Sequence, residues 1–467
     1  MKIFLHRNFR YLFCFILIVF LTFCGSTHAR ANETNATVNE TLLKAISTNP
    51  EIQAKWHSFL ASDKDLVSAK GGYLPKLDLT AGLGRENLDG KAYAGRDFQN
   101  YSRDGVTLSL TQMIFDGKLT YSQTKRYAHS KKMRYFNLIS SMEQIGLAAI
   151  RSHEDVLRYR TLVEMAKGNL ERHQVIMDKI EKRTIAGVDS KVNFETTKGR
   201  LSLARVNLMT EESNLHDSIT QYVRIVGENP ADILENASID IDLPIDPKAS
   251  LEEALSGNSQ VSSYQENAKS MLFAIGEQKS KMYPRLDIRA SANFENDVDG
   301  TEGRRDKALI ELILRYNLFN GGSDKANIEK SIELHKESEE NLKKVERDIT
   351  QSVLVAHNDV QSLQNQLADL EQHRISADNT RIVYGKQFEA GRRSLLDLLD
   401  AENEYFQADR ALANTEFNLV IAKTSYLTAT GQLLIHYDVL RDDVLTAQKI
   451  GEDTVRTLIL CNGALKK

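Results

Sequence analysis

The sequence predicts a mainly α-helical protein built twice from one plan, in which a strand hairpin is followed by long coiled-coil helices. Apolar residues recur every seven positions between residues 384 and 432. The same pattern occurs 204 residues earlier, as the match of Tyr222 to Tyr426 shows. Two segments ahead of these stretches instead alternate apolar and polar residues. A seven-residue period predicts a left-handed coiled coil, whereas a two-residue period predicts a strand.

The heptad repeat places large and small side chains in neighbouring columns. The large column is Leu398, Tyr405, Leu412, Leu419 and Tyr426. The small column is Ala401, Ala408, Thr415, Ala422 and Ala429. Small residues beside large ones allow a neighbouring helix to approach closely, so these helices are expected to pack against one another along their length.

The internal repeat also predicts where the long helices reverse. Ala186-Gly187 matches Ala390-Gly391 at the same offset. Each pair lies roughly 65 residues after a turn, Phe-Asp-Gly in the first copy and Phe-Asn-Gly in the second, which at about 1.5 Å per residue is on the order of 100 Å of helix. We therefore expect Gly187 and Gly391 to mark reversals, each followed by a second long helix.

The predicted strand hairpins cover about residues 74–116 and 284–319. Their apolar positions are Leu77, Leu79, Ala81, Leu83, Val106, Leu108 and Leu110, and then Leu286, Ile288, Ala290, Ala292, Phe294, Ala308, Ile310, Leu312 and Leu314. Strands of about ten residues with aromatic residues near their ends suit a tilted span of a bilayer. The alternative is a half-buried hairpin on a soluble domain.

Four strands are too few for a membrane β-barrel, which needs at least about eight. Unpaired strand edges cannot face lipid, so oligomerisation must close the barrel. Three chains would supply 12 strands, with their polar faces enclosing water.

The remaining chain divides around the two copies. Residues 1–31 predict a signal peptide, with Lys2, Arg7 and Arg10 ahead of a short apolar run; the alternative is an uncleaved anchor. Residues 32–230 form the first repeat, 231–249 a polar linker, 250–434 the second repeat and 435–467 an unassigned C-terminal tail. Each repeat is expected to begin with one helix, at residues 39–70 and at residues 250–281. Cys24 lies in a poor match to a lipoprotein box, so lipidation is the minor alternative there.

Composition and motifs do not indicate an enzyme, a cofactor or a nucleic-acid partner. The formal net charge is −4, so no basic surplus suggests nucleic acid. The sequence contains no phosphate-binding glycine loop, nucleophile elbow or His-Glu-x-x-His spacing. His153 beside Glu154 and Asp155 is the nearest thing to a cluster. Adjacent helical residues point apart, so a surface position is expected for it.

The chain resembles the TolC-type outer membrane channel proteins. The matching segments are the duplicated strands YLPKLDLTAGLG and YPRLDIRASANF, the paired FDG and FNG turns, and AGRRSLLDLLDAENEYFQADRAL. The resemblance implies a homotrimer with a 12-stranded barrel in the outer membrane and an α-helical tunnel in the periplasm. It also implies that the protein is the exit duct of a tripartite export system, with a periplasmic adaptor and an inner membrane ABC or proton-driven transporter as partners. The first strand favours the type I protein secretion branch over efflux of small molecules.

The same resemblance implies a periplasmic gate near the second reversal. Its acidic rings fall on Asp397 and Asp400, and its network arginine falls on Arg393. Two positions depart from the family pattern: Phe388 replaces the gate tyrosine, and Asn193 replaces an acidic partner. Read without the resemblance, Asp397 and Asp400 are a solvated helix face with N-terminal charge. The competing protein class is a soluble periplasmic coiled-coil adaptor, which would not need four amphipathic strands.

Overall fold

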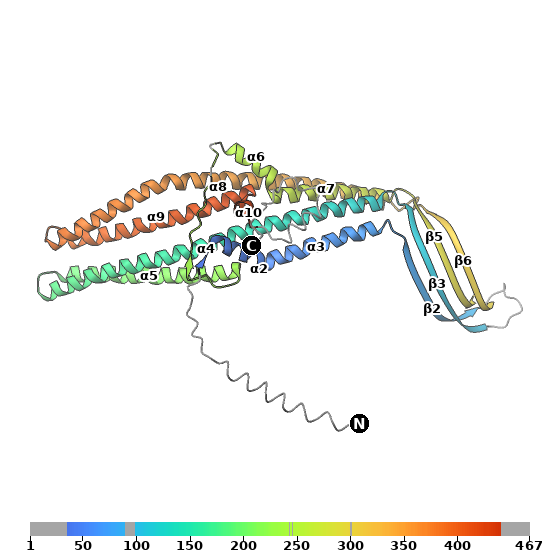
Figure 1. Ribbon diagram of the computed structural model, residues 1–467, viewed down its shortest axis with the longest axis horizontal. Coiled ribbons are helices and arrows are strands. Elements are labelled where there is room, and N and C mark those ends of the chain that lie inside the picture. The colour runs from blue at the N-terminus through green and yellow to red at the C-terminus, as the bar shows by residue number, and fades with distance from the viewer. Residues whose placement is uncertain (1–34, 89–98, 242, 245, 299–300, 440–467) are drawn as a thin grey trace, which may run out of the picture.

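The computed structural model describes residues 35–88, 99–241, 243–244, 246–298 and 301–439. The predicted signal peptide and Cys24 lie outside the described residues, as does residue 440 onward of the predicted tail. Within this part the molecule is elongated, with helices along most of its length and a β-sheet at one end (Figure 1).

The long helices of the two copies have identical lengths. Helix α4, Leu119–Ile185, and helix α8, Ser323–Glu389, each contain 67 residues. Helix α5, Lys191–Val226, and helix α9, Leu395–Thr430, each contain 36. At about 1.5 Å per residue the longer pair extends on the order of 100 Å. The prediction of a duplicated fold with very long helices is confirmed.

The helix expected at the start of each copy is in fact two helices. Helices α2, Val38–Thr48, and α3, Pro50–Gly71, meet at Asn49; helices α6, Pro247–Gly257, and α7, Ser259–Ser280, meet at Asn258. Each asparagine has extended backbone, with ψ near 125°, and its side-chain oxygen accepts a hydrogen bond from the first turn of the next helix. Its side-chain amide also donates to a carbonyl near the end of the returning long helix, Ile225 or Ala429. These hydrogen bonds satisfy backbone groups beside the break, so interrupting the helix there costs less free energy.

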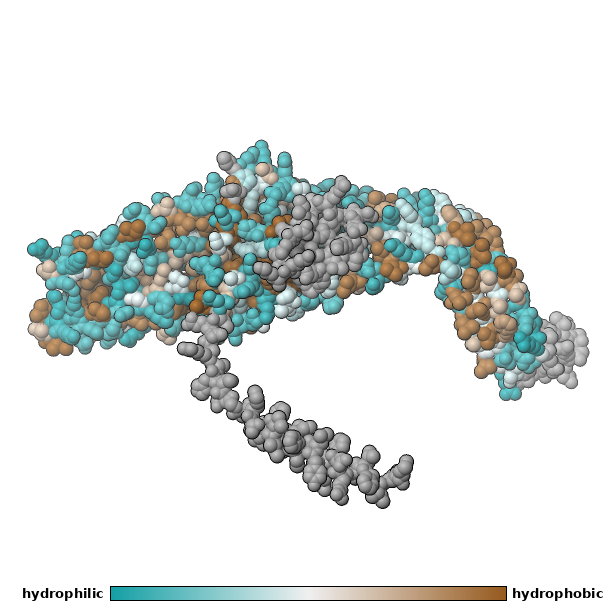
Figure 2. Space-filling view, viewed as in Figure 1, coloured by the Kyte–Doolittle hydropathy of each residue, from teal (hydrophilic) through white to brown (hydrophobic). Residues whose placement is uncertain are grey.

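The four predicted strands form one antiparallel sheet. Strands β2, Lys76–Leu88, β3, Gln99–Phe115, β5, Arg285–Val298, and β6, Thr301–Arg315, lie in the order β2-β3-β5-β6. The register aligns the apolar positions in rows, one of which is Leu77, Leu110, Ala290 and Ile310. One face is therefore apolar, and Figure 2 shows apolar residues gathered over the sheet.

Strand β6 departs from strict alternation. Leu309 pairs with Ser291 and Ile313 with Asp287, so both leucine and isoleucine lie on the otherwise polar face. Alternation in this strand is clear only for Ala308, Ile310, Leu312 and Leu314, whose partners are apolar.

Helix α4 is the central element of the helical part, packing against α3, α5, α7 and α9. The largest buried apolar cluster lies where α2, α4 and α5 meet the short helix α10, Leu433–His436. The segment predicted as a polar linker joins this core. Strand β4, Ile233–Leu234, pairs in parallel with β1, Asn35–Ala36, and Leu234, Ala237 and Ile239 are buried.

Among the described residues, no helix is both long enough and apolar enough to cross a bilayer.

Candidate functional site

The two helix reversals lie side by side at the end of the molecule farthest from the sheet (Figure 1). Gly187 and Gly391 have φ of 74° and 71°, a backbone region that favours glycine. In each turn the next residue, Val188 or Arg392, donates its backbone N–H to a carbonyl of the last helical turn. This is the glycine-dependent helix end that the repeated Ala-Gly pairs suggested.

Asp397 stabilises the start of α9. Its backbone N–H donates to the Ser394 hydroxyl at 3.1 Å, and its carboxylate accepts from the Ser394 backbone N–H at 3.3 Å, which is a capping box. The Ser394 hydroxyl also donates to the carboxylate, and this bond is the main cause that lowers the pKa of Asp397. Arg393 Nη1 lies 3.7 Å from the same carboxylate. Asp397 is therefore ionised and partly exposed at the tip.

Arg393 and Asn193 each form their hydrogen bonds within their own hairpin. The Arg393 Nε donates to Gln387 at 3.0 Å, and its guanidinium lies 4.2 Å from the ring centre of Tyr384. The Asn193 amide donates to Asp189 at 2.6 Å. The structure thus places both residues at the tip, where Arg393 stiffens the second turn and Asn193 the first.

Phe388 packs into an apolar cluster instead of forming a polar link. It is buried with Leu395, Leu398 and Leu399 of α9 and Ile176 and Ile180 of α4. The Arg183 guanidinium lies 5.4 Å from its ring centre, in reach of a cation–π contact. Because α4 belongs to the first hairpin, this cluster joins the two hairpins.

Ion pairs also join the hairpins. Arg200 of α5 pairs with Asp400 of α9 at 2.9 Å, and Lys179 of α4 pairs with Glu389 at the end of α8 at 2.7 Å. The Lys179 contact lowers the pKa of Glu389. The basic partner comes from the first copy and the acidic partner from the second in both pairs.

Glu402 is the most buried acid of this group. Its carboxylate accepts from Arg172 of α4 at 2.9 Å and lies 3.5 Å from Arg381 of α8, with only 7% of its side chain exposed. Farther along the same helices Arg410 pairs with the nearly buried Glu211. Sequence analysis missed these contacts because pairing charges across hairpins needs the relative register of α4 and α9, which no local pattern provides.

His153 is buried, so its expected surface position is wrong. Both His153 and Glu154 have 0% exposure. His153 Nδ1 lies 2.9 Å from the Thr41 hydroxyl, and Nε2 lies 2.8 Å from the carbonyl oxygen of Glu235. Glu154 accepts from the backbone N–H of Ala237 at 2.9 Å. The adjacent side chains both reach the segment 231–239, which lies against α4 and buries them.

A catalytic or metal centre does not emerge from these contacts. In the described ranges, no group of three or more His, Cys, Asp or Glu side chains is arranged to hold a metal ion. The charged residues at the tip instead pair with one another, an arrangement that can hold two hairpins together.

Comparison with known proteins identifies relatives over most of the chain. The family model described as "Outer membrane efflux protein" matches residues 41–228 and 250–432, one match for each copy. The outer membrane efflux protein BepC of Brucella suis is 22% identical over 402 residues, covering 85% of this chain and 86% of BepC. The outer membrane protein TolC of Escherichia coli is 20% identical over 404 residues, covering 83% and 80%.

Solved structures of low sequence identity share the fold. The outer membrane channel CmeC of Campylobacter jejuni superposes with a TM-score of 0.79 at 12% identity, covering 89% of each chain. CusC gives a TM-score of 0.74 at 14% identity, covering 84% of this chain and 91% of that chain. The two family matches, the shared fold and the amphipathic sheet agree, and this chain belongs to the outer membrane efflux protein family, as a protein of the outer membrane.

Proposed function

We propose that three copies of this chain assemble into a passive exit duct, with a 12-stranded barrel in the outer membrane and a helical tunnel in the periplasm. The observation that carries the proposal is the sheet, whose apolar side chains share one face and are exposed in the single chain. Leu79 is 69% exposed and Ile310 is 79% exposed in the single chain. Soluble proteins rarely expose so many neighbouring apolar side chains to water, whereas lipid accommodates them.

The edges of the sheet support a closed assembly. Strands β2 and β6 each pair with one neighbour in the described chain and present a free edge on the other side. A free edge in lipid leaves backbone N–H and C=O groups without partners. Pairing β6 of one copy with β2 of the next removes every edge when the ring closes.

Closure is tested by the native mass of the protein extracted from isolated outer membranes in mild detergent. Three copies per particle are expected. A monomer in the soluble periplasmic fraction would contradict the proposal and support the competing class, a periplasmic coiled-coil adaptor. The soluble chain would then have to bury the apolar sheet face in some other contact.

The duct is proposed to work with a periplasmic adaptor and an inner membrane ABC or proton-driven transporter. The sequence contains no phosphate-binding glycine loop, so these partners are proposed to supply the energy. The tip of the helical hairpins is the proposed gate, with Asp397 and Asp400 forming acidic rings around the axis of the trimer. Arg393, Phe388 and Asn193 are proposed to brace the closed tip by the contacts described above.

The proposed cargo is protein, exported by type I secretion. Two relatives bear names of this kind, the alkaline protease secretion protein AprF of Pseudomonas aeruginosa and the proteases secretion protein PrtF of Dickeya chrysanthemi. Efflux of small molecules is the second candidate, because BepC is named an efflux protein and OpmQ a pyoverdine export protein.

Deletion of the gene in its native host separates the two cargoes. Loss of a secreted protein from the culture medium, with unchanged sensitivity to dyes and detergents, is expected for protein secretion. Increased sensitivity with an unchanged set of secreted proteins would contradict that cargo and favour efflux. Restoration by the wild-type gene, but not by a copy lacking residues 285–315, is the matched control.

A further inference from the structure

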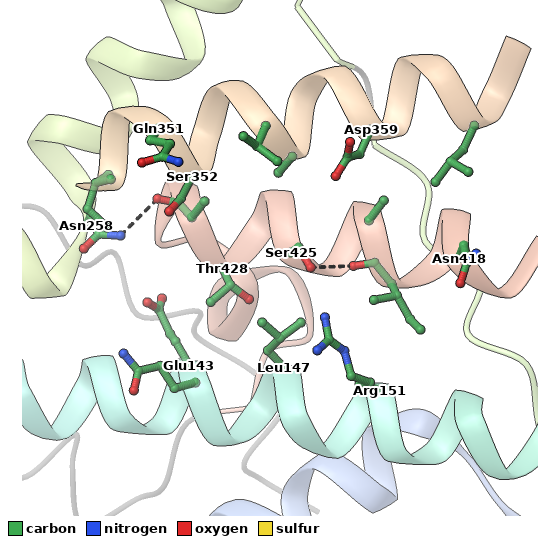
Figure 3. A pocket seen from close by; sticks show the side chains of 18 of the residues that line it. Glu143, Leu147, Arg151, Asn258, Gln351, Ser352, Asp359, Asn418, Ser425 and Thr428 are labelled. Atoms are coloured by element: carbon green, nitrogen blue, oxygen red, sulfur yellow. Dashed lines mark hydrogen bonds between the residues drawn. The ribbon is translucent and has the colours of Figure 1, made fainter. Parts of the chain in front are cut away.

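A hollow of about 820 Å³ lies between helices α4, α8 and α9, well away from the helix tips (Figure 3). Its floor is formed by small residues of α9, among them Ala422, Ser425 and Ala429, while α4 and α8 form the walls. Sites for small molecules in proteins have volumes of about 300–1,000 Å³. Gln144 and Arg151 on one wall and Asp359 on the other are exposed, so solvent reaches the hollow.

Glu143 enters this hollow as a buried carboxylic acid. Only 4% of the residue is exposed, and Figure 3 shows its side chain extending from α4 toward α9. Burial raises its pKa to about 8, with no compensating contact. Within the described ranges we find no hydrogen bond or ion pair to this carboxyl. A carboxyl in so buried a position is costly to ionise unless it gains a partner of opposite charge.

Three of the polar residues that line the hollow are already engaged in hydrogen bonds. The Asn258 oxygen accepts from the backbone N–H groups of Gln260 and Val261, and the Asn418 oxygen accepts from Arg158. The Ser425 hydroxyl donates to the Ile421 carbonyl of its own helix. Of the two acids in the lining, Glu143 is buried and Asp359 is exposed, so Glu143 is the acid that solvent reaches least.

The hollow is lined by both polar and apolar side chains. Glu143, Arg151 and Asp359 are its titratable lining residues in the described chain, two acids and one base. Arg151 also acts on Asp155, one turn farther along α4, and partly offsets the burial that raises the pKa of Asp155. Leu147, Val355, Leu363 and Ile421 contribute apolar surface to the lining. A ligand that suits this lining carries a positive charge and an apolar body.

We propose that the hollow binds a small organic cation, a protonated alkylamine with an apolar body, whose ammonium group pairs with the Glu143 carboxylate. The ammonium supplies the hydrogen-bond donors and the opposite charge that the Glu143 carboxylate needs in a partner. The apolar body covers the leucine and valine side chains of the walls. This inference goes beyond the proposed function, because binding needs neither transport nor a partner protein.

The test is equilibrium binding to the full-length protein, purified from outer membranes in detergent. The probe is a dansyl-labelled pentylamine, followed by its fluorescence, and the matched neutral probe is the corresponding dansyl-labelled pentanol. Saturable binding of the amine is expected. Glu143→Gln should weaken it by about tenfold, or about 1.4 kcal/mol, while affinity for the alcohol changes less than about twofold. Glu164→Gln, at an exposed acid of the same helix that pairs with Lys167 outside the hollow, should leave both affinities unchanged.

The pH dependence gives a second readout. The affinity of wild-type protein for the amine should rise on the order of tenfold between pH 6.5 and 8.5 as Glu143 loses its proton, and Glu143→Gln should abolish that rise. Equal affinity for amine and alcohol, absence of saturable binding, or an unchanged affinity in Glu143→Gln would each overturn the proposal. Thermal unfolding shows whether the Glu143→Gln variant is correctly folded. Its unchanged affinity for the alcohol is an independent check of the fold.

Discussion

His153 and His357, 204 residues apart, hold the two ends of the segment that joins the repeats. His153 Nε2 donates to the carbonyl oxygen of Glu235 at 2.8 Å, and His357 Nε2 donates to that of Pro244 at 2.9 Å. A carbonyl oxygen only accepts, so Nε2 carries the proton in both residues. The duplicated helices thus use equivalent side chains to fix a segment that is itself present once.

Each histidine belongs to a duplicated polar group. Thr41 lies 3.3 Å from the Tyr222 hydroxyl, and the equivalent Ser250 lies 2.7 Å from the Tyr426 hydroxyl. In the first copy the Thr41 hydroxyl also bonds His153 Nδ1, whereas in the second copy the His357 ring lies 6.4 Å from that of Tyr426. Each group therefore forms one hydrogen bond to the segment, but the first group has an additional hydrogen bond between its own side chains.

Replacing the two histidines should separate their contributions. His153→Leu should lower the free energy of unfolding by about 2–3 kcal/mol, since it leaves two buried polar partners unsatisfied. His357→Leu should lower it by about 1 kcal/mol, since it removes one hydrogen bond. Thermal unfolding of the purified protein measures the difference. Equal losses would show that the Thr41 contact contributes nothing.

Glu154 should make stability depend on pH. Burial raises its pKa to about 7, and one carboxyl oxygen is buried without a hydrogen-bond partner among the described residues. The folded protein keeps this proton while the unfolded chain releases it at its ordinary pKa. Stability should therefore fall as pH rises from about 4.5 to 7 and level off above that.

The variant Glu154→Gln removes this titration. Its amide oxygen can still accept from Ala237, so the variant should be more stable than the wild type at pH 8 by on the order of 1–3 kcal/mol. At pH 4.5 the two proteins should match. Thermal unfolding across this pH range gives the comparison, and parallel curves for the two proteins would show that Glu154 is ionised in the folded state.

Two equivalent glycines should differ in their tolerance of alanine. Gly117 and Gly321 both have positive φ, at 65° and 56°. A Cβ at Gly117 would lie 2.6 Å from the Ser280 carbonyl oxygen, whereas at Gly321 nothing lies within 4 Å. Gly321→Ala should cost about 1–2 kcal/mol from backbone strain alone. Gly117→Ala should cost more and reduce the amount of protein recovered in the outer membrane, as immunoblots of membrane fractions would show.

The ion pairs between the hairpins should be unequal in strength. Glu402 is 7% exposed and contacts Arg172 and Arg381, while Glu389 is 62% exposed and contacts Lys179. Glu402→Ala should weaken the contact between the hairpins by about 3 kcal/mol, because it leaves the Arg172 guanidinium without its carboxylate, whereas Arg381 keeps its ion pair with Asp378. Glu389→Ala should cost much less, because solvent screens this exposed ion pair. Single-channel conductance of each variant reports tip opening, and a larger increase for Glu389→Ala would contradict this ranking.

Asp397 and Asp400 should control ion selectivity if they line the trimer axis. The double variant Asp397→Ala, Asp400→Ala removes six carboxylates from a three-fold entrance and should lower cation selectivity. The reversal potential across a planar bilayer with a KCl gradient measures this change. Asp348→Asn, an exposed acid paired with Lys344 elsewhere on α8, is the control. An unchanged reversal potential in the double variant would leave Asp397 as a helix cap and Asp400 as the partner of Arg200.

The sequence by itself determined the features that depend on local periodicity. The seven-residue repeat of Leu398 to Tyr426 and the alternation of Leu77 to Leu83 each set a backbone conformation by where apolar side chains must point. The offset of 204 residues determined that α4 and α8 have equal length, and positive φ at Gly187 and Gly391 followed from the paired Ala-Gly sequences.

The tertiary structure alone decided which distant residues meet. Asn49 and Asn258 each donate to a carbonyl of a distant helix, Ile225 or Ala429, and these contacts depend on the tertiary fold, although Pro50 already marks the first break in the sequence. His153 and Glu154 are buried because residues 231–239 cover α4. The ion-pair partners of Asp400 and Glu402 depend on how the two hairpins align along their length. The hairpins are far apart in the sequence, so no local pattern contains this alignment. Local sequence fixes backbone conformation, whereas contacts between elements depend on how complete surfaces fit together.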